Sequence, residues 1–235
     1  MGDLYVVRHA QASFGKPDYD QLSELGFRQG DLLAAFMEQT GLRFEAVYSG
    51  EMKRHVDTAR ALLPRLNPDR VGSGLRLRPE FNEFDMASVV NLQLPILIQE
   101  NPALGTDIDA LFTDPHALYR ILNITLARWI NNPEGVEGVE TWPAFTRRVW
   151  RGLDQITGEA GRGRTIALVT SGGPLAALLQ KALHIPDLSA IDLAWQIRNA
   201  SVSTFKFSPG RFSLASFNSV AHLEIQKDHT LITYR

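Results

Sequence analysis

The clearest structural signal in the chain is the stretch Thr165-Ile166-Ala167-Leu168-Val169-Thr170-Ser171-Gly172-Gly173-Pro174. Its first six residues, four apolar ones between two threonines, are typical of a buried strand. The turn at residues 171–174 then leads into apolar residues at helical spacing, from Leu175 to Leu183. A strand, a tight turn and a helix in this order predict one unit of an α/β fold.

The same order occurs twice near the start of the chain. Residues 4–7 and 44–48 are predicted strands, and each is followed by a segment with apolar residues at helical spacing. Ser23 is a candidate cap for the first of these helices and Gly41 its stop, while Pro64 ends the second. The repeated order predicts an α/β three-layer sandwich with a mostly parallel central sheet.

Two regions depart from this alternation. Residues 86–134 are mostly apolar with a helical pattern, and we interpret about 86–135 as a helical cap insertion before a long helix that begins near Thr141. Near the other end, residues 201–207, 212–217 and 221–225 are predicted short strands, joined by turns at 209–210 and 218–219. Because no repeat or linker divides the chain, we expect a single domain over residues 1–235 that carries this insertion.

The composition excludes several classes of function. The 235 residues include no cysteine, which excludes disulfides, thiolate metal sites and cysteine nucleophiles. The 24 Lys and Arg nearly balance the 26 Asp and Glu, so the net charge of −2 predicts no nucleic-acid or membrane-surface partner. No stretch approaches the roughly 20 apolar residues of a membrane span, and Met1–Val7 lacks the layout of a signal peptide. We therefore expect a cytoplasmic protein.

The residues that follow the predicted strands form a candidate site, because ligands of open α/β sheets bind beyond the carboxyl ends of the strands. They are Arg8 and His9, Ser49 and Arg54, Glu80, Glu83 and Asp85, and Ser171-Gly172-Gly173 at the start of a helix. Arginines and a helix N-terminus donate hydrogen bonds to phosphate oxygens. Neighbouring cations should lower the pKa of His9 and leave a ring nitrogen free to attack phosphorus, while a carboxylic acid protonates the departing oxygen.

Each of these signals also has a plain structural interpretation. An Arg-His pair after a strand is most often a surface pair, and Lys53-Arg54-His55 alone is typical of a solvated helix face. Residues 171–174 alone are a turn with a helix cap. Their common position at one edge of the sheet favours a phosphoryl-binding site. The sequence contains neither a Gly-x-Ser-x-Gly elbow at Ser171 nor a P-loop.

Several motifs, in order along the chain, resemble the histidine phosphatase superfamily, whose fold is phosphoglycerate-mutase-like. Val7-Arg8-His9-Ala10-Gln11 is similar to its Arg-His-Gly signature, and residues 49–59 resemble its Ser-x-x-x-x-Arg-x-x-x-Thr-Ala helix. Phe81-Asn82-Glu83 resembles the stretch that holds its acidic residue, and residues 169–174 are similar to its Val-Ser-His-Gly-Gly segment. Further similar stretches at 22–29, 138–149, 199–202 and 217–223 extend the resemblance from Leu4 to about Ile225.

The resemblance implies a phosphoric monoester hydrolase that uses no metal and no cofactor and acts on a small phosphorylated substrate. His9 would form a phosphohistidine, and Glu83 would be the general acid, with Glu80 as the competing candidate. Four residues would contact the phosphoryl group: Arg8, Arg54, Ser171 and Gly172.

Three positions depart from the family pattern. Ala10 replaces the signature glycine, and Gly15 lies where some members have an asparagine. Ser171 stands where the family has its second active-site histidine, so a neutral donor replaces one that carries charge. Losing one preorganised donor costs roughly 2.7–4 kcal/mol of barrier in other enzymes. Three histidines are substitutes by residue type alone: His55, His116 and His222, the last being explained more simply as structural.

The sequence therefore leaves three functions open. The first is the phosphatase. The second, suggested by Ser171, is a catalytically weak or inactive relative that binds phosphorylated ligands or a protein partner. The third is a phosphoglycerate-type mutase, for which no residue argues. The substrate, the role of the insertion and the oligomeric state, a dimer included, are also open.

Overall fold

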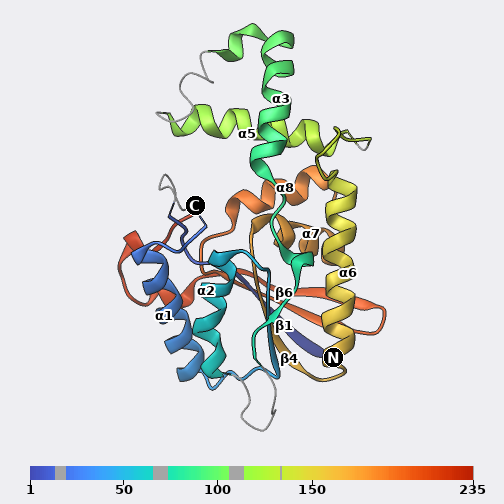
Figure 1. The fold of residues 1–235 in the computed structure, drawn as a ribbon. Coiled ribbons are helices and arrows are strands. Elements are labelled where there is room, and N and C mark those ends of the chain that lie inside the picture. Colours follow the sequence, from blue (N-terminus) through green and yellow to red (C-terminus); the bar gives the residue numbers. More distant parts are fainter. Residues whose placement is uncertain (14–19, 66–73, 106–113, 133, 235) are drawn as a thin grey trace. The chain divides into compact units, whose positions relative to one another are not determined.

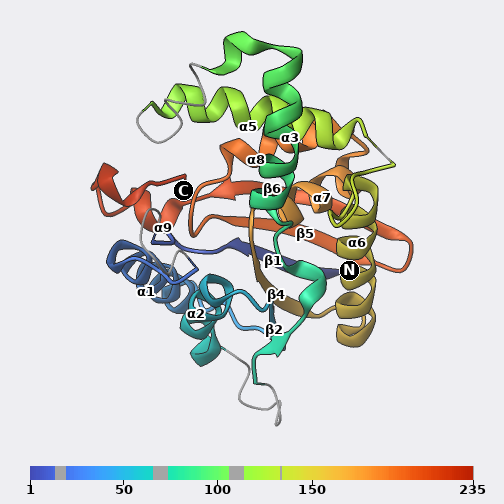
Figure 2. The same cartoon turned by 45° about the horizontal axis from the view of Figure 1, so that its top comes forward.

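The computed structural model describes residues 1–13, 20–65, 74–105, 114–132 and 134–234. Within them one sheet has the strand order β3-β2-β4-β1-β5-β6 (Figures 1 and 2). The strands are β1 (Gly2–Arg8), β2 (Ala46–Ser49), β3 (Arg76–Leu77), β4 (Thr165–Thr170), β5 (Val202–Ser208) and β6 (Arg211–Ser219). The strands β1 to β4 pair in parallel, while β5 and β6 are antiparallel to their neighbours. The predicted α/β class with a mostly parallel central sheet is confirmed.

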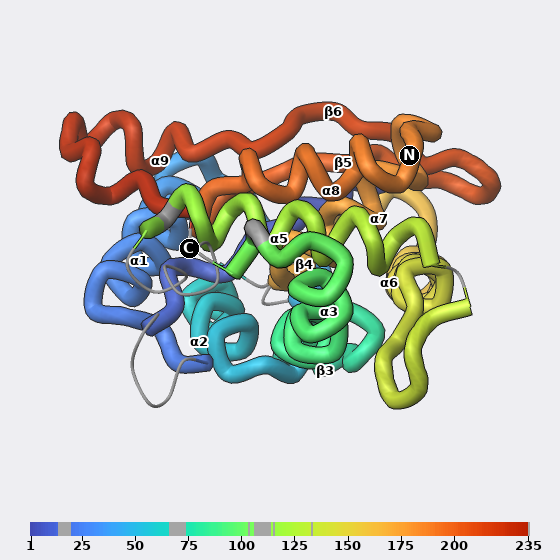
Figure 3. Tube along the Cα trace, turned by 90° about the horizontal axis from the view of Figure 1, so that it is seen from above, coloured from blue at the N-terminus to red at the C-terminus, as the bar shows by residue number. Residues whose placement is uncertain are grey.

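Helices cover both faces of this sheet (Figure 3). They are α1 (Glu24–Gln39), α2 (Lys53–Leu62), α6 (Trp142–Ala160), α7 (Gly172–Leu183), α8 (Asp187–Gln196) and α9 (Ala221–Glu224). On one face Val7 and Val169 pack against Leu33 of α1 and Leu62 of α2 in a buried cluster. On the other, the Tyr48 hydroxyl contacts Glu159 of α6 at 3.1 Å, and Trp150 Nε1 of α6 donates to the Ala177 carbonyl of α7 at 2.8 Å. The three layers follow from these two sets of contacts.

The local signals for α1 act as predicted. Ser23 caps the helix, since its Oγ accepts from the Gly26 amide at 3.0 Å. Gly41 follows the helix end with φ of +68°, a left-handed conformation that glycine adopts without steric cost. Ser23 therefore marks the start of α1, and Gly41 marks the turn that follows its end.

The predicted strand at 221–225 is wrong, because residues 221–224 form the short helix α9. Over so few residues an alternating pattern does not distinguish strand from helix. Helical spacing brings Val220 and Leu223 together against Leu231 in a small buried cluster. The predicted turn at 218–219 is also wrong, since both residues end β6. The second strand begins at Ala46 rather than at residue 44, and α8 was not predicted.

The chain divides into two compact units, Met1–Glu83 with Arg148–Arg235 and Phe84–Arg147. The second unit contains α3 (Met86–Glu100) and α5 (Pro115–Ile130). Its core includes an aromatic cluster in which the Phe84 and Trp129 rings lie 4.5 Å apart and those of Trp129 and Trp142 lie 5.5 Å apart. This unit includes the predicted insertion, whose role as a cap stays a prediction. None of the helices described has the length and apolar character that crossing a membrane requires.

Candidate active site

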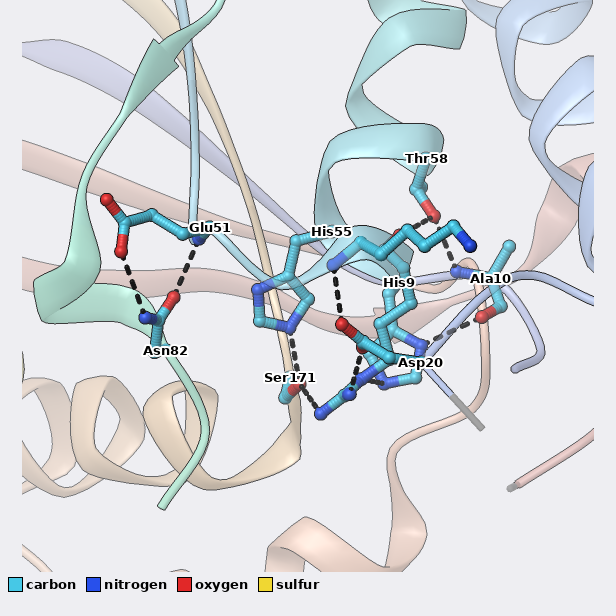
Figure 4. A network of polar contacts seen from close by, with 10 residues as sticks. His9, Ala10, Asp20, Glu51, His55, Thr58, Asn82 and Ser171 are labelled. Carbon is cyan, nitrogen blue, oxygen red and sulfur yellow. Dashed lines mark hydrogen bonds and ion pairs between the residues drawn. The ribbon is translucent and has the colours of Figure 1, made fainter. Parts of the chain in front are cut away.

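Four buried polar side chains meet at the carboxyl ends of β1, β2 and β4 in the first unit (Figure 4). His9 follows β1, and its amide donates to the Thr170 carbonyl at the end of β4 at 2.8 Å. Arg54 and His55 lie in the first turn of α2, and Ser171 follows β4. None of the four is more than 5% exposed. The structure therefore brings His9, Arg54 and Ser171 together, as the sequence predicted, and places His55, a substitute named by residue type alone, beside them.

His9 is held in one tautomer. Its Nδ1 lies 2.8 Å from the Ala10 carbonyl oxygen, and because a carbonyl only accepts, Nδ1 carries the proton. The lone pair of Nε2 receives a hydrogen bond from Arg54 Nε at 3.2 Å. Burial, and then the charges of Arg54 and Arg8, lower the pKa of His9 well below its usual range. The ring is therefore neutral. Burial lowers the pKa more than the neighbouring cations do, whereas the sequence pointed only to the cations.

Arg54 spreads its nitrogens over three partners. Besides Nε on His9, Nη1 binds Asp20 Oδ1 at 2.5 Å and Nη2 donates to Ser171 Oγ at 3.4 Å. The other Asp20 oxygen accepts from the Lys53 amide at 2.7 Å. An oxyanion bound here would meet the donors that Asp20 now uses. Asp20 was missed by sequence reasoning, and no spacing signal marks it.

Thr58 links the segment after His9 to Arg54. Its Oγ1 accepts from the Ala10 amide at 3.0 Å and donates to the Arg54 carbonyl at 2.8 Å, and the side chain is buried. One hydroxyl thus joins the end of β1 to the first turn of α2. The quoted Thr-Ala motif contained Thr58 but assigned it no role. Ala10 itself packs with Leu22 in a small buried cluster that accommodates its methyl group.

Arg8 is engaged by the backbone. Its Nη1 donates to the Ile197 carbonyl and its Nη2 to the Tyr234 carbonyl, the latter at 3.0 Å. Its charge nevertheless contributes to lowering the pKa of His9. A direct contact between Arg8 and phosphate stays a prediction.

The two candidate general acids, Glu83 and Glu80, contact different helices. Glu83 Oε2 accepts from the Gly173 amide at 3.1 Å, at the start of α7, where Ser171 is the residue before the helix. Glu80 instead packs along α6, because a Cβ added to Gly152 would lie 2.6 Å from the Glu80 Cβ. Free amides at the first turn of a helix attract anions. Glu83 and Gly172 therefore share the helix terminus beside Ser171.

The stretch around Glu83 is held by α6 and by the loop after β2. Arg148 Nη1 donates to three carbonyl oxygens, those of Pro79 at 3.1 Å, Glu80 at 2.9 Å and Asn82 at 3.2 Å. Asn82 Oδ1 accepts from the Glu51 amide at 2.7 Å (Figure 4). These contacts give the general-acid candidate a fixed backbone.

Several other candidates are placed elsewhere. His116 is an exposed residue of the second unit, and His222 lines a separate cavity of about 310 Å³. Asp85 caps α3 through the Ser88 amide at 3.0 Å. Gly15 lies outside the described residues. Within the part of the chain that the structure describes, no group of three or more His, Asp or Glu side chains is placed to hold a metal ion.

Comparisons with known proteins agree with the topology. The chain is similar to phosphoserine phosphatase from Entamoeba histolytica, with 17% identity, a TM-score of 0.64 and coverage of 95% of this chain and 100% of that one. It is also similar to phosphoglycerate mutase from Bacillus anthracis, with 19% identity, a TM-score of 0.61 and 96% coverage of both chains. A mycobacterial glucosyl-3-phosphoglycerate phosphatase shows 20% identity and a TM-score of 0.58 over 92% of this chain and 98% of its own. At these identities the likeness shows the fold.

Membership of a family rests on a comparison of sequence. No curated protein matches the chain. The family model of the histidine phosphatase superfamily (branch 1) matches residues 4–119 and 116–220, which span the whole site described above. The chain belongs to the histidine phosphatase superfamily.

Proposed function

We propose that this protein is a phosphatase that hydrolyses a small phosphomonoester through a phosphohistidine at His9, without a metal ion. The observation that carries the proposal is the state of His9, which is buried and neutral, with its proton on Nδ1 and its Nε2 lone pair facing Arg54. An unprotonated imidazole nitrogen is a nucleophile, and a guanidinium beside it stabilises the charge of a phosphoryl group.

In the first step His9 Nε2 attacks phosphorus. The P–N bond forms as the P–O bond to the alcohol breaks, and the carboxylic acid of Glu83 gives its proton to the departing oxygen. Arg54 moves its hydrogen bonds from His9 and Asp20 to the phosphoryl oxygens. The Gly172 amide, at the start of α7, is a further donor for those oxygens.

In the second step water attacks the phosphorus of the phosphohistidine. Glu83, now a carboxylate, takes a proton from this water as the P–N bond breaks and the electron pair returns to His9 Nε2. Inorganic phosphate leaves, and both residues return to their starting states. One carboxyl group thus acts first as acid and then as base, a role we assign to Glu83, which accepts from the Gly173 amide at the start of α7.

A small phosphorylated substrate fits the relatives whose ligands are known by name. The Entamoeba phosphatase was solved with phosphoserine and also with 3-phosphoglyceric acid. We propose the same general class, a small molecule with a phosphomonoester, for this chain, and a cytoplasmic location. A mutase receives no support from a specific contact in the site.

The test is hydrolysis of a panel of phosphomonoesters by the wild type and by His9→Ala. We expect phosphate release from the wild type alone, with a phosphoenzyme that is labile in acid and stable in base. Glu83→Gln should slow release by about 100-fold, the lower end of a general acid's usual contribution, and Glu80→Gln is its matched control. Equal rates for wild type and His9→Ala would refute the proposal and favour the ligand-binding relative.

A further inference from the structure

His55 and Ser171 form a buried pair that the reaction above does not use. Their exposed fractions are 0% and 1%, and His55 Nε2 lies 2.5 Å from Ser171 Oγ. In Figure 4 the pair lies beside His9, whose ring centre is 5.6 Å from that of His55. Ser171 is thus held in place by the backbone at the end of β4 and by a short hydrogen bond to His55 of α2.

The position of the proton in this pair follows from the surroundings of His55. Its Nδ1 faces Gly50, where an added Cβ would lie only 2.3 Å away, and it has no hydrogen-bond partner among the described residues. A proton on Nδ1 would be a buried donor without an acceptor, which proteins avoid. The proton therefore lies on Nε2, and His55 donates to Ser171 Oγ.

With this proton position, the Ser171 hydroxyl can still donate one hydrogen bond. A hydroxyl has two acceptor positions and one proton. Ser171 Oγ accepts from His55 Nε2 and from Arg54 Nη2, at 2.5 Å and 3.4 Å, so both acceptor positions are filled. Its own O–H must donate to a further acceptor, and Arg54 Nη2 places that hydroxyl beside the guanidinium that contacts His9.

The charge state of His55 is consistent with this role. Burial, and then the charge of Arg54, lower the pKa of His55 well below its usual range. The neutral imidazole carries its one N–H proton on Nε2. Its Nδ1, which faces Gly50, therefore carries no proton. The hydroxyl of Ser171 is thereby turned away from His55 and stays a donor at neutral pH.

We propose that His55 is a positioning residue of the phosphatase. It orients the Ser171 hydroxyl so that this hydroxyl donates a hydrogen bond to an oxygen of the phosphoryl group held between Arg54 and His9. Ser171 is then a phosphoryl ligand, and His55 acts only through it. The inference rests on the proposed function, since it assigns how that site grips its ligand.

The test is a double-mutant cycle at the two positions. Ser171→Ala should lower kcat by about 100-fold, as removal of a preorganised donor does elsewhere. His55→Leu, which fills the space without a donor, should lower it by about 10-fold. His55→Gln places an amide donor near the position of Nε2 and should recover most of this loss. Because His55 acts through Ser171, the double variant His55→Leu/Ser171→Ala should be no slower than Ser171→Ala alone.

A second readout separates orientation from general damage to the fold. Vanadate, a phosphoryl mimic, should bind more weakly to His55→Leu and Ser171→Ala than to His55→Gln, measured by titration calorimetry. The matched control is His222→Leu, which removes a buried histidine that lines another cavity and should leave vanadate affinity unchanged.

Three results would overturn the inference. Losses that multiply in the double variant would show that His55 acts independently of Ser171. Equal vanadate affinity in all variants would show that neither residue serves the ligand. An acid-stable, base-labile phosphoenzyme that Ser171→Ala abolishes would make the serine a nucleophile. If the wild type hydrolyses no better than His9→Ala, the proposed function fails, and the vanadate affinities alone decide the role of His55.

Discussion

We expect the protein to lose stability in mild acid because of the buried His222 side chain, which takes no part in the proposed reaction. Its side chain in α9 is 2% exposed, and its Nε2 has no hydrogen-bond partner among the described residues. The ring lies 6.2 Å from that of Phe36. Burial lowers its pKa from 6.5 to about 4. In the unfolded chain the same histidine takes up a proton near pH 6.5.

The sign follows from proton binding. Between about pH 6.5 and pH 4 the unfolded state holds a proton at His222 that the folded state does not, so the free energy of unfolding falls as the pH falls. The two pKa values differ by about 2.5, and each unit corresponds to about 1.4 kcal/mol. His222 therefore lowers stability by about 3 kcal/mol between neutral pH and pH 4.

Urea unfolding of the wild type and of His222→Leu across this pH range measures the effect. The pKa values of His9 and His55 are also lowered, so the wild type should lose more than the share of His222. Both of these residues stay in the variant, so the difference between the two proteins isolates His222. That difference should shift by about 3 kcal/mol in favour of the variant as the pH falls to 4.

The control is Leu223→Ala, which removes a fully buried neighbour that does not titrate. Its difference from the wild type should stay constant with pH. The reasoning would be refuted if the gap between wild type and His222→Leu were equally constant, because His222 would then have the same pKa in the folded and unfolded states.

Three further predictions concern the contacts around Arg54. Thr58→Val leaves the buried Ala10 amide without its acceptor and should lower the free energy of unfolding by about 1–3 kcal/mol in urea; Thr58→Ser keeps the hydroxyl, and a loss as large as that of valine would contradict the argument. Asp20→Asn removes a carboxylate that Arg54 binds at 2.5 Å, so inorganic phosphate should inhibit at several-fold lower concentration, whereas an unchanged inhibition constant would mean that Asp20 does not compete with the ligand. Arg54→Lys cannot donate to His9, Asp20 and Ser171 together, so kcat should fall by about 100-fold with an unchanged circular dichroism spectrum; a rate near that of the wild type would show that one point charge is enough.

Much of the fold was predictable because its signals are local. The strand at Thr165–Thr170 has four consecutive apolar residues between two threonines, and the first helix is bounded by Ser23 and Gly41. Residues 221–225 were assigned wrongly because five residues fit both periods, and packing of Leu223 against Leu231 decided for a helix.

The site was predictable in its members but not in its contacts. His9 and Ser171 follow strands of one mostly parallel sheet, and Arg54 lies at the start of the helix after another, so topology alone brings them to one edge. Asp20 carries no motif, and its ion pair with Arg54 depends on a fold of the chain that no spacing reveals. Sequence reasoning named His55 by residue type only, as one of three histidines.

The sequence by itself determined the order of elements, the family and the set of polar residues at one sheet edge. Periodicity and turn chemistry act over a few residues, and ordered motifs are read directly from the chain. The tertiary structure alone decided that His55 binds Ser171 and that Asp20 binds Arg54, pairs separated by 116 and 34 residues. Hydrogen bonds act over about 3 Å, so tautomers, partners and pKa values are set only when burial has fixed those distances.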